Sequence, residues 1–246
     1  MGINRRRATS EEEIIYSIQV LNESFLKNTK TDEWDNFVFR GFVWIDDESL
    51  AEKLQEFVAR NSDNFRIGGS TSRGLGKVKT ELYPAEVPVV TLQSRIDNFN
   101  QALQTRWKLW SIFGKCKNDL LTGKTYFTLD LQSDAILSEN WQRTTVISAD
   151  MLKDVANIND ESLEMHLAYS SYDYRSGWNS AWGLMKDVEL VTNKGSVYLF
   201  STTQPEKWYP VLENLSKNGI GDRTCEGFGQ VEVCNEFHQV FRENAK

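Results

Sequence analysis

A pattern of glycines occurs twice in this chain of 246 residues, and the repeat constrains the fold more than any other feature. Residues 67–78 read IGGSTSRGLGKV, and residues 220–231 read IGDRTCEGFGQV. Both follow the spacing I-G-x5-G-[L/F]-G-x-V, which aligns Gly68 with Gly221. An internal repeat of this kind indicates two copies of one structural unit within the chain.

The residues around each glycine segment repeat as well. Residues 37–45 alternate apolar and other side chains, which predicts a strand with one buried face, and residues 195–201 predict a strand at the corresponding place. A helix is expected after each strand: Asp46 or Asp47 can cap the first, and Pro205 opens the second. Each unit is therefore predicted to run strand, helix, glycine segment, strand.

Both predicted helices carry apolar residues at i, i+4 and i+7, so each is expected to bury one stripe. The stripe of the first helix consists of Leu50, Leu54, Phe57 and Val58. The stripe of the second consists of Trp208, Leu212 and Leu215.

Further strands are expected at residues 14–21, 126–137 and 165–174, with a short helix at 149–155. The second half can thus supply a whole β-α-β-β-α-β unit, the ferredoxin-like or RRM-like arrangement. The first half offers no candidate for the opening strand and helix. We therefore expect an α+β protein with two ferredoxin-like units, the first of which lacks its opening strand and helix.

The expected organisation has three parts. Residues 1–95 form a partial ferredoxin-like unit with the first glycine loop, residues 96–124 form a basic connecting segment, and residues 125–246 form the second unit with the C-terminal glycine loop. An incomplete first unit would expose a sheet edge and an apolar face. We expect a companion chain or an adjoining subunit to cover them, next to residues 14–21 and 75–82.

The charge is acidic overall but uneven. A net charge of −7 argues against a protein that coats nucleic acid over its whole surface, because counterion release requires clustered Lys and Arg. Three basic clusters are nevertheless present: Arg5, Arg6 and Arg7; Arg66, Arg73, Lys77 and Lys79; and Arg106, Lys108, Lys115, Lys117 and Lys124. This distribution suits a subunit that binds RNA along one face, with ordinary solvated charge as the alternative.

Several classes of site are disfavoured. The three cysteines have no C-x-x-C spacing, which fits neither a disulfide framework nor a zinc site, so no metal and no cofactor is expected. The first glycine segment lacks the GK[ST] ending of a nucleotide-binding loop. The N-terminus is polar and basic, and no apolar run approaches the ~18 residues of a membrane span. A cytoplasmic protein without membrane contact is expected.

Catalysis is not expected, because no catalytic constellation is recognisable. The two histidines are His166, inside a predicted strand, and His238, near the C-terminus, and each is expected to be structural. Metal-independent RNA cleavage normally requires histidine, tyrosine or lysine near a 2′-hydroxyl. An endoribonuclease and a purely protein-binding scaffold remain the alternatives to an RNA-binding protein.

Glycines between a helix and a strand have two interpretations. They allow positive φ and close approach of another chain, and the free N–H groups of such a loop can hold phosphate oxygens. They can also serve only a tight turn or a bulge. Two equivalent loops, one of which carries Arg73 and Lys77, favour the first interpretation.

These glycine segments resemble those of the RAMP superfamily, the proteins that form the backbone of CRISPR effector complexes. Residues 219–233 are similar to the C-terminal glycine-rich loop of that family. Residues 2–21, 65–78 and 176–200 resemble the RAMP subunit of subtype III-D systems that is grouped with the proteins capping the guide RNA 5′ tag. The N-terminal strand and helix of the family are absent from this sequence, and Glu226 stands where the first loop has Arg73.

The resemblance implies a non-catalytic, RNA-binding subunit of a type III, III-D-like, effector complex in antiviral defence. Its implied partners are the CRISPR guide RNA (crRNA), other RAMP subunits and the large signalling subunit. An endoribonuclease that processes precursor crRNA is the implied alternative. Tyr172 and Tyr174 are candidates for stacking on bases, with burial in the core as the other interpretation. The residues expected to contact RNA are Arg5, Arg6, Arg7, Gly68, Gly69, Ser70, Ser72, Arg73, Gly74, Gly76, Lys77, Lys79, Arg175, Trp178, Gly219, Gly221, Arg223, Gly227, Phe228 and Gly229.

Overall fold

The chain folds into two compact units, Met1–Leu82 and Tyr83–Lys246. The computed structural model describes residues 3–4, 9–10, 20, 22–28, 33–43, 45, 47–68, 71–84, 91–114, 121–179 and 181–239. Helices and antiparallel sheets occur together, as the predicted α+β class requires.

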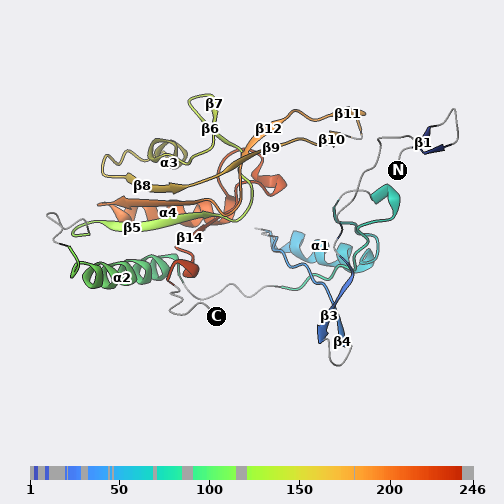
Figure 1. Cartoon of the computed structure of the whole chain (residues 1–246), viewed down its shortest axis with the longest axis horizontal. Helices are drawn as coiled ribbons and strands as arrows, with labels where there is room; N and C mark the ends of the chain where they lie inside the picture. Colours follow the sequence, from blue (N-terminus) through green and yellow to red (C-terminus); the bar gives the residue numbers. More distant parts are fainter. Residues whose placement is uncertain are drawn as a thin grey trace. The chain divides into compact units, whose positions relative to one another are not determined.

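A four-stranded antiparallel sheet forms the centre of the second unit, in the order β14-β5-β13-β8 (Figure 1). Its strands are β5 (Thr125–Leu131), β8 (Glu164–Tyr169), β13 (Val197–Thr202) and β14 (Val231–Val233). Helix α3 (Ala149–Ala156) follows β5 in the chain, and helix α4 (Pro205–Asn218) follows β13. Of these four strands, β5 comes first in the chain. It lies inside the sheet and pairs with both β13 and β14.

Alternation along β5 supplies the main core. Phe127, Leu129 and Leu131 are buried on one face, because successive side chains of a strand point to opposite faces. The stripe of α4 packs in the same cluster, with the Phe127 and Trp208 rings 6.2 Å apart. Trp208, Leu212 and Leu215 are all buried, which confirms the predicted stripe of this helix.

Asp160 ties three elements together in the core. Its carboxylate accepts hydrogen bonds from Thr202 Oγ1 (2.6 Å) at the end of β13, from Trp208 Nε1 (2.8 Å) in α4 and from Ser162 N (2.9 Å) before β8. Burial opposes the charged form of Asp160, but these hydrogen bonds outweigh it and lower the pKa of the carboxyl to about 2. The ion is therefore kept charged inside the fold.

A helix that the sequence analysis did not predict packs beside this sheet. Helix α2 (Leu92–Trp110) lies alongside β5 and β14 (Figure 1). Its Asn100 side chain donates to Tyr126 O (2.7 Å) and accepts from Tyr126 N (2.8 Å), so it pairs with β5 as a neighbouring strand would. Residues 96–124 were expected to connect the two units, but α2 buries Ile96 and Phe99 in the core of the second unit.

Two of the predicted strands are divided in the structure. The strand predicted at 165–174 becomes β8 and β9, and the one predicted at 126–137 becomes β5 and β6. β6 (Leu137–Glu139) pairs with β7 (Gln142–Thr144), β9 (Tyr172–Arg175) with β12 (Glu189–Thr192), and β10 (Trp178–Asn179) with β11 (Leu184–Met185). The β9–β12 and β10–β11 pairs form an arm that extends away from the four-stranded sheet (Figure 1).

The described residues of the first unit form two short strand pairs and one long helix. β1 (Ile3–Asn4) pairs with β2 (Thr9–Ser10), and β3 (Ser24–Asn28) pairs with β4 (Glu33–Asn36). Helix α1 (Glu48–Arg60) begins after Asp47, whose carboxylate accepts a hydrogen bond from Ser49 N at 2.9 Å. This confirms the first predicted helix and assigns its cap to Asp47.

The strand predicted at residues 37–45 is wrong. β4 ends at Asn36, and residues 37–43 are irregular and exposed. An internal strand needs a hydrogen-bonding neighbour, and in the described part of the first unit no strand runs beside these residues. For the same reason, the strand predicted at 75–82 is reduced to one bridge between Arg66 and Lys77. Most of the strand predicted at 14–21 lies outside the described residues.

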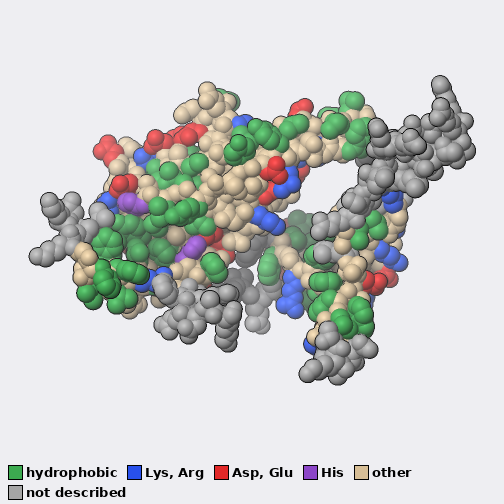
Figure 2. Space-filling view, in the orientation of Figure 1, with side chains coloured by type: hydrophobic (Ala, Val, Ile, Leu, Met, Phe, Trp, Pro, Cys, Tyr) green, Lys and Arg blue, Asp and Glu red, His purple; other side chains and the backbone are tan. Residues whose placement is uncertain are grey.

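Hydrophobic side chains are exposed in several places on the visible face of the molecule. Figure 2 shows them over β3 and β4, over β10 and β11, and at the C-terminal end of α2. None of the helices in the described ranges combines the length and the apolar composition that a bilayer span requires.

The Asp160 network generates a test of the core. We expect Asp160→Asn to lower the free energy of unfolding by about 2–4 kcal/mol, because buried donors lose a charged acceptor. The pKa of this carboxyl is lower in the folded chain than the ~3.9 of an unfolded one, so its contribution is complete at neutral pH and is lost as the pH falls from about 4 to about 2. Denaturation of the full chain at several pH values should show a shallower acid limb for the variant.

The matched control is Asp154→Asn, which changes an exposed aspartate of α3. It should alter the free energy of unfolding by no more than about 0.5 kcal/mol and leave the acid limb unchanged. Equal effects of the two substitutions would contradict the role given to Asp160.

Candidate nucleic-acid interface

The two glycine loops share corresponding backbone hydrogen bonds. Ile67 N donates to Gly76 O at 2.8 Å, and Ile220 N donates to Gly229 O at 2.8 Å. A 3-10 turn occupies the same place in each loop, at Thr71–Arg73 (η1) and Thr224–Glu226 (η2). The sequence repeat is therefore also a structural repeat.

The aligned glycines adopt matching positive φ angles. The pairs are Gly68 (88°) with Gly221 (86°), Gly74 (86°) with Gly227 (92°), and Gly76 (78°) with Gly229 (70°). L-residues rarely adopt these conformations, which explains the glycines at all six positions. The surroundings of the three pairs nevertheless differ.

Internal packing accounts for Gly76 and Gly229. A Cβ at Gly76 would lie 2.2 Å from Ile67 O, and one at Gly229 would lie 1.8 Å from Ile220 O. Both distances are far below van der Waals contact, so a side chain would break the closing hydrogen bond of its loop. This pair serves the fold of each loop.

Gly74 and Gly227 are different, because no atom in the described part of the chain lies within 4 Å of a Cβ built at either position. Each ends its 3-10 turn through a hydrogen bond from its N–H, to Thr71 O (3.1 Å) or to Thr224 O (3.0 Å). The backbone here is open to approach by another molecule. Open, positive-φ backbone is the arrangement that close contact with a phosphate chain requires.

The third pair of glycines, Gly68 and Gly221, has different surroundings in the two loops. In the second unit a Cβ at Gly221 would lie 2.3 Å from Ile136 O, and Asp222 N donates to the same oxygen at 2.8 Å. The chain that follows β5 thus packs directly on the second loop. In the first unit no atom of the described residues lies within 4 Å of a Cβ at Gly68.

The loops also differ in charge. Arg73 and Lys77 are exposed on the first loop, and Lys79 forms an ion pair with Glu81 at 3.0 Å. In the second loop Glu226 replaces Arg73 and accepts a hydrogen bond from Arg223 Nε at 2.8 Å. This hydrogen bond lowers the pKa of Glu226. The second loop thus pairs an acidic with a basic residue, whereas the first has a basic residue, Arg73, at the position of Glu226.

The structure brings some predicted site residues together. Arg175, at the base of the arm, lies 3.1 Å from Asp134 Oδ2, and Asp134 O accepts the N–H of Gly229 at 2.8 Å. Arg223 packs over the Phe228 ring at 5.3 Å from its centroid. Arg175, Arg223, Phe228 and the second loop therefore belong to one surface of the second unit.

The remaining predicted residues are dispersed. Arg5, Arg6, Arg7, Gly69 and Ser70 lie outside the described residues, and Ser72 belongs to η1. Gly219 packs against the second loop, where a Cβ would lie 2.8 Å from Gly229 O. Trp178, Tyr172 and Tyr174 are exposed on the arm, so burial in the core does not account for them.

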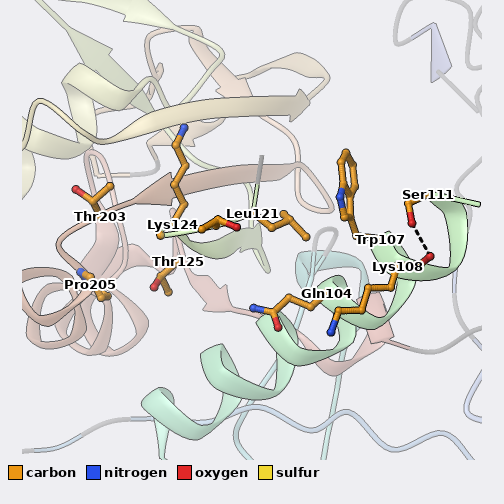
Figure 3. Close-up of a pocket in the computed structure, with 11 residues that line it drawn as sticks. Gln104, Trp107, Lys108, Ser111, Leu121, Lys124, Thr125, Thr203 and Pro205 are labelled. Carbon is orange, nitrogen blue, oxygen red and sulfur yellow. Dashed lines mark hydrogen bonds between the residues drawn. The ribbon is translucent and has the colours of Figure 1, made fainter. Parts of the chain in front are cut away.

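A cavity of about 720 Å³, which the sequence analysis did not anticipate, opens beside α2 (Figure 3). Gln104, Trp107 and Lys108 of α2 line one side, and residues 121–125 line another. Its Lys124 donates to Glu164 at 2.8 Å. The spacing of the apolar residues in α2 indicates a helix. The basic residues of this segment, on which the expectation of a connecting segment was based, do not.

Both histidines have internal partners. His166 Nε2 lies 2.8 Å from Ser201 Oγ, and its ring packs 5.2 Å from the Tyr126 ring. His238 Nε2 is hydrogen-bonded to Asp130. Within the described ranges no group of three or more His, Cys, Asp or Glu residues is arranged to hold a metal ion.

Comparison with known proteins gives distant structural likenesses alone. No family model and no curated protein matches the chain. Among solved structures, a chain of the "Cryo-EM structure of the Type III-B Cmr-beta bound to cognate target RNA" is similar to 87% of this chain, over 77% of its own length, with 12% identity and a TM-score of 0.32. A likeness of this strength does not establish a family or a function.

The two kinds of loop glycine can be separated by substitution. We expect Gly227→Ala to lower the free energy of unfolding by only about 1–2 kcal/mol, the cost of a left-handed L-residue in open space. Gly229→Ala adds a clash with Ile220 O and should cost about 3 kcal/mol or more. Chemical denaturation of the full chain measures both values, and equal losses would contradict the packing role of Gly229.

Proposed function

We propose that this chain is a non-catalytic RNA-binding subunit of a type III CRISPR effector complex. The observation that carries the proposal is the pair of glycine loops, which share one backbone geometry and are open at Gly74 and Gly227. The resemblance of residues 65–78, 176–200 and 219–233 to RAMP proteins supports the same assignment. The III-D-like subtype rests on that resemblance alone.

We further propose that both units are versions of the ferredoxin-like fold. The second unit supports this through its order of strand, helix, strand, strand, helix, strand and through a sheet in which β5 lies between β13 and β14. The first unit contributes α1 and a loop that shares its closing hydrogen bond and its 3-10 turn with the second. It is the partial copy in this proposal.

The first loop holds the guide RNA in this proposal. In RNA-guided complexes base pairing reads the sequence, while the protein holds the RNA through its backbone and shape. Arg73 and Lys77 supply charge for phosphates beside the open backbone of Gly74. The segment held is the repeat-derived 5′ tag, as the resemblance implies.

The second loop has a lesser part in RNA binding. The ion pair between Arg223 and Glu226 satisfies its own charges, so fewer counterions are released when a phosphate approaches. The arm can compensate by stacking, because Tyr172, Tyr174 and Trp178 are exposed and aromatic faces accept any base. Neighbouring RAMP subunits and the large signalling subunit are the proposed protein partners.

The proposed function does not include catalysis. His166 and His238 are each held by a side chain of the second unit, Ser201 and Asp130. A histidine that acts as a general acid or base would have to be within hydrogen-bond reach of the RNA group whose proton it transfers. Cleavage of a repeat RNA by the purified chain would contradict this part and favour an endoribonuclease, whereas assembly without RNA would favour a scaffold.

Charge removal on the first loop tests the proposal. The double variant Arg73→Gln, Lys77→Gln should bind a repeat-derived RNA more weakly and with a smaller salt dependence. Each lost contact to single-stranded RNA lowers the slope of log affinity against log salt by about 0.7, so roughly 1.4 is expected for two. The measurement is an RNA-binding titration of the assembled complex at several salt concentrations.

The control variant carries the same charge change on α4, Lys207→Gln and Lys217→Gln, both exposed. Its slope should equal that of the unmodified protein. An unchanged slope for the Arg73 and Lys77 variant would place the first loop away from the RNA.

A further inference from the structure

The four-stranded sheet of the second unit has a second face, opposite the one that packs on α4. Phe127 and its alternate neighbours on β5 belong to the core beside α4, so Thr128 and Asp130 point to the opposite face. The register places Val197 of β13 beside Asp130, and Tyr169 of β8 beside Val197. Asp130, Val197 and Tyr169 therefore form one row across this second face.

The second face is open on the side of β8. Tyr169 is 69% exposed, and Leu167, which points to the same face of β8, is 46% exposed. Figure 2 shows hydrophobic side chains gathered over the strands of this sheet. Burial in the core therefore does not account for the apolar residues on this face of β8.

The other end of the row opens into a cavity of about 490 Å³. Asp130 and Val197 line this cavity, and η3 (Glu236–Gln239) contributes Phe237 and His238 to its wall. Sites for small organic groups typically enclose roughly 300–1,000 Å³, so one nucleotide fits this volume. The Phe237 ring is 74% exposed. Both ends of the row thus present an aromatic ring.

Hydrogen bonds hold η3 against the sheet. His238 Nε2 is hydrogen-bonded to Asp130 of β5. Arg106 of α2 donates to the backbone oxygens of His238 (3.0 Å) and Gln239 (2.8 Å). The wall that carries Phe237 is therefore in place before a ligand binds, which reduces the entropy lost on binding.

The charges at this face suit a phosphate group. Lys194, in the turn between β12 and β13, is exposed and lines the cavity. The acidic residues of the row have internal donors, because Asp130 accepts from Thr128 Oγ1 at 2.9 Å and Glu232, beside it on β14, accepts from Arg95 Nη1 at 3.2 Å. The ammonium group of Lys194 can thus pair with a phosphate at this site.

We infer that this face of the second unit binds two nucleotides of single-stranded RNA. One base enters the cavity and stacks on Phe237, the other stacks on Tyr169, and Lys194 pairs with a phosphate of the same strand. Asp130 and Tyr169, at the ends of the row, are two strand spacings apart, roughly 10 Å, which neighbouring bases splayed out of a stack can bridge. The inference rests on the proposed function for the identity of the polymer, but the site is separate from both glycine loops and from the arm.

The lining of the cavity favours RNA over a segment of polypeptide. Lys194 and Gln132 contribute an ammonium and an amide beside the apolar surface of Val197 and Phe237. An aliphatic side chain in the cavity would cover these polar groups without bonding to them, whereas a base and its phosphate can satisfy both. A duplex does not fit, because its bases are stacked and paired rather than splayed out.

Ultraviolet crosslinking of the native assembly tests the site directly. The tagged full chain is purified with its RNA and irradiated, and nucleotide adducts are localised to single residues by mass spectrometry. Because short-wavelength light joins bases to the side chains that they touch, we expect adducts at Tyr169 and Phe237. Trp141, in the turn between β6 and β7, is a fully exposed aromatic residue of the same unit and should carry none.

The absence of adducts from both Tyr169 and Phe237 would overturn the inference. Adducts confined to the arm or to other segments of the chain would overturn it as well. Adducts within residues 65–78 report separately on the first loop. Failure of this site and failure of the proposed function therefore give different results.

Removal of the rings measures their contribution to affinity. Labelled oligouridine is titrated with the full chain that carries the two glutamine substitutions of the first loop, so that the second unit is measured by itself. Tyr169→Ala and Phe237→Ala should each weaken binding by about tenfold, the loss expected for one stacked base. Tyr169→Phe keeps the ring and Trp141→Ala lies elsewhere, so both should bind as the starting protein does.

Both alanine variants should fold normally, because the replaced rings are exposed, and circular dichroism checks this. Unchanged affinity in both would contradict the inference. Lys194→Gln should lower the slope of log affinity against log salt by about 0.7, whereas Lys207→Gln on α4 should not change it. Uridine monophosphate should compete weakly, because it occupies one of two positions. Competition equal to that of oligouridine, at the same nucleotide concentration, would assign the cavity to a free nucleotide and overturn the inference.

Discussion

The pairing of β5 with both β13 and β14 is the constraint on which the second unit depends. It joins the two strands that flank a glycine loop, it supplies the apolar face that buries the stripe of α4, and the chain beyond it packs on Gly221. Asp160 fixes the far end of the same assembly by accepting hydrogen bonds from β13 and α4. The described part of the first unit has a corresponding helix and loop but no strand in this position, and Leu50, Phe57 and residues 37–43 are exposed, whereas Val58 is buried.

The glycines of the two loops have three separate physical roles. Gly76 and Gly229 allow each loop to close on itself, Gly221 allows a neighbouring segment to approach, and Gly74 and Gly227 leave open backbone at the surface. Conservation of spacing between the loops does not require equal function. Charge separates them, because Glu226 of the second loop forms an ion pair with Arg223, whereas the first loop has Arg73 at the position of Glu226.

The sequence predicted those features of the structure that interactions between residues close in the chain determine. The stripe of α4, the cap at Asp47 and the common geometry of the loops follow from spacing and side-chain chemistry. Alternation at residues 37–45 identifies a possible face but not the neighbour that a strand needs, so that prediction was wrong. Helix α2 was missed although Leu92, Ile96, Phe99 and Leu103 have helical spacing, because its basic residues suggested a connecting segment. The cavity beside α2 depends on distant segments and had no sequence signal.

The central claim is that this chain holds a guide RNA as part of an effector complex. The most direct test is to purify the tagged chain from its host under native conditions and sequence the RNA that accompanies it. The account predicts discrete small RNAs that share one repeat-derived 5′ end, together with other subunits of the complex. A preparation free of RNA, or one containing cellular RNA fragments with heterogeneous 5′ ends, would contradict it.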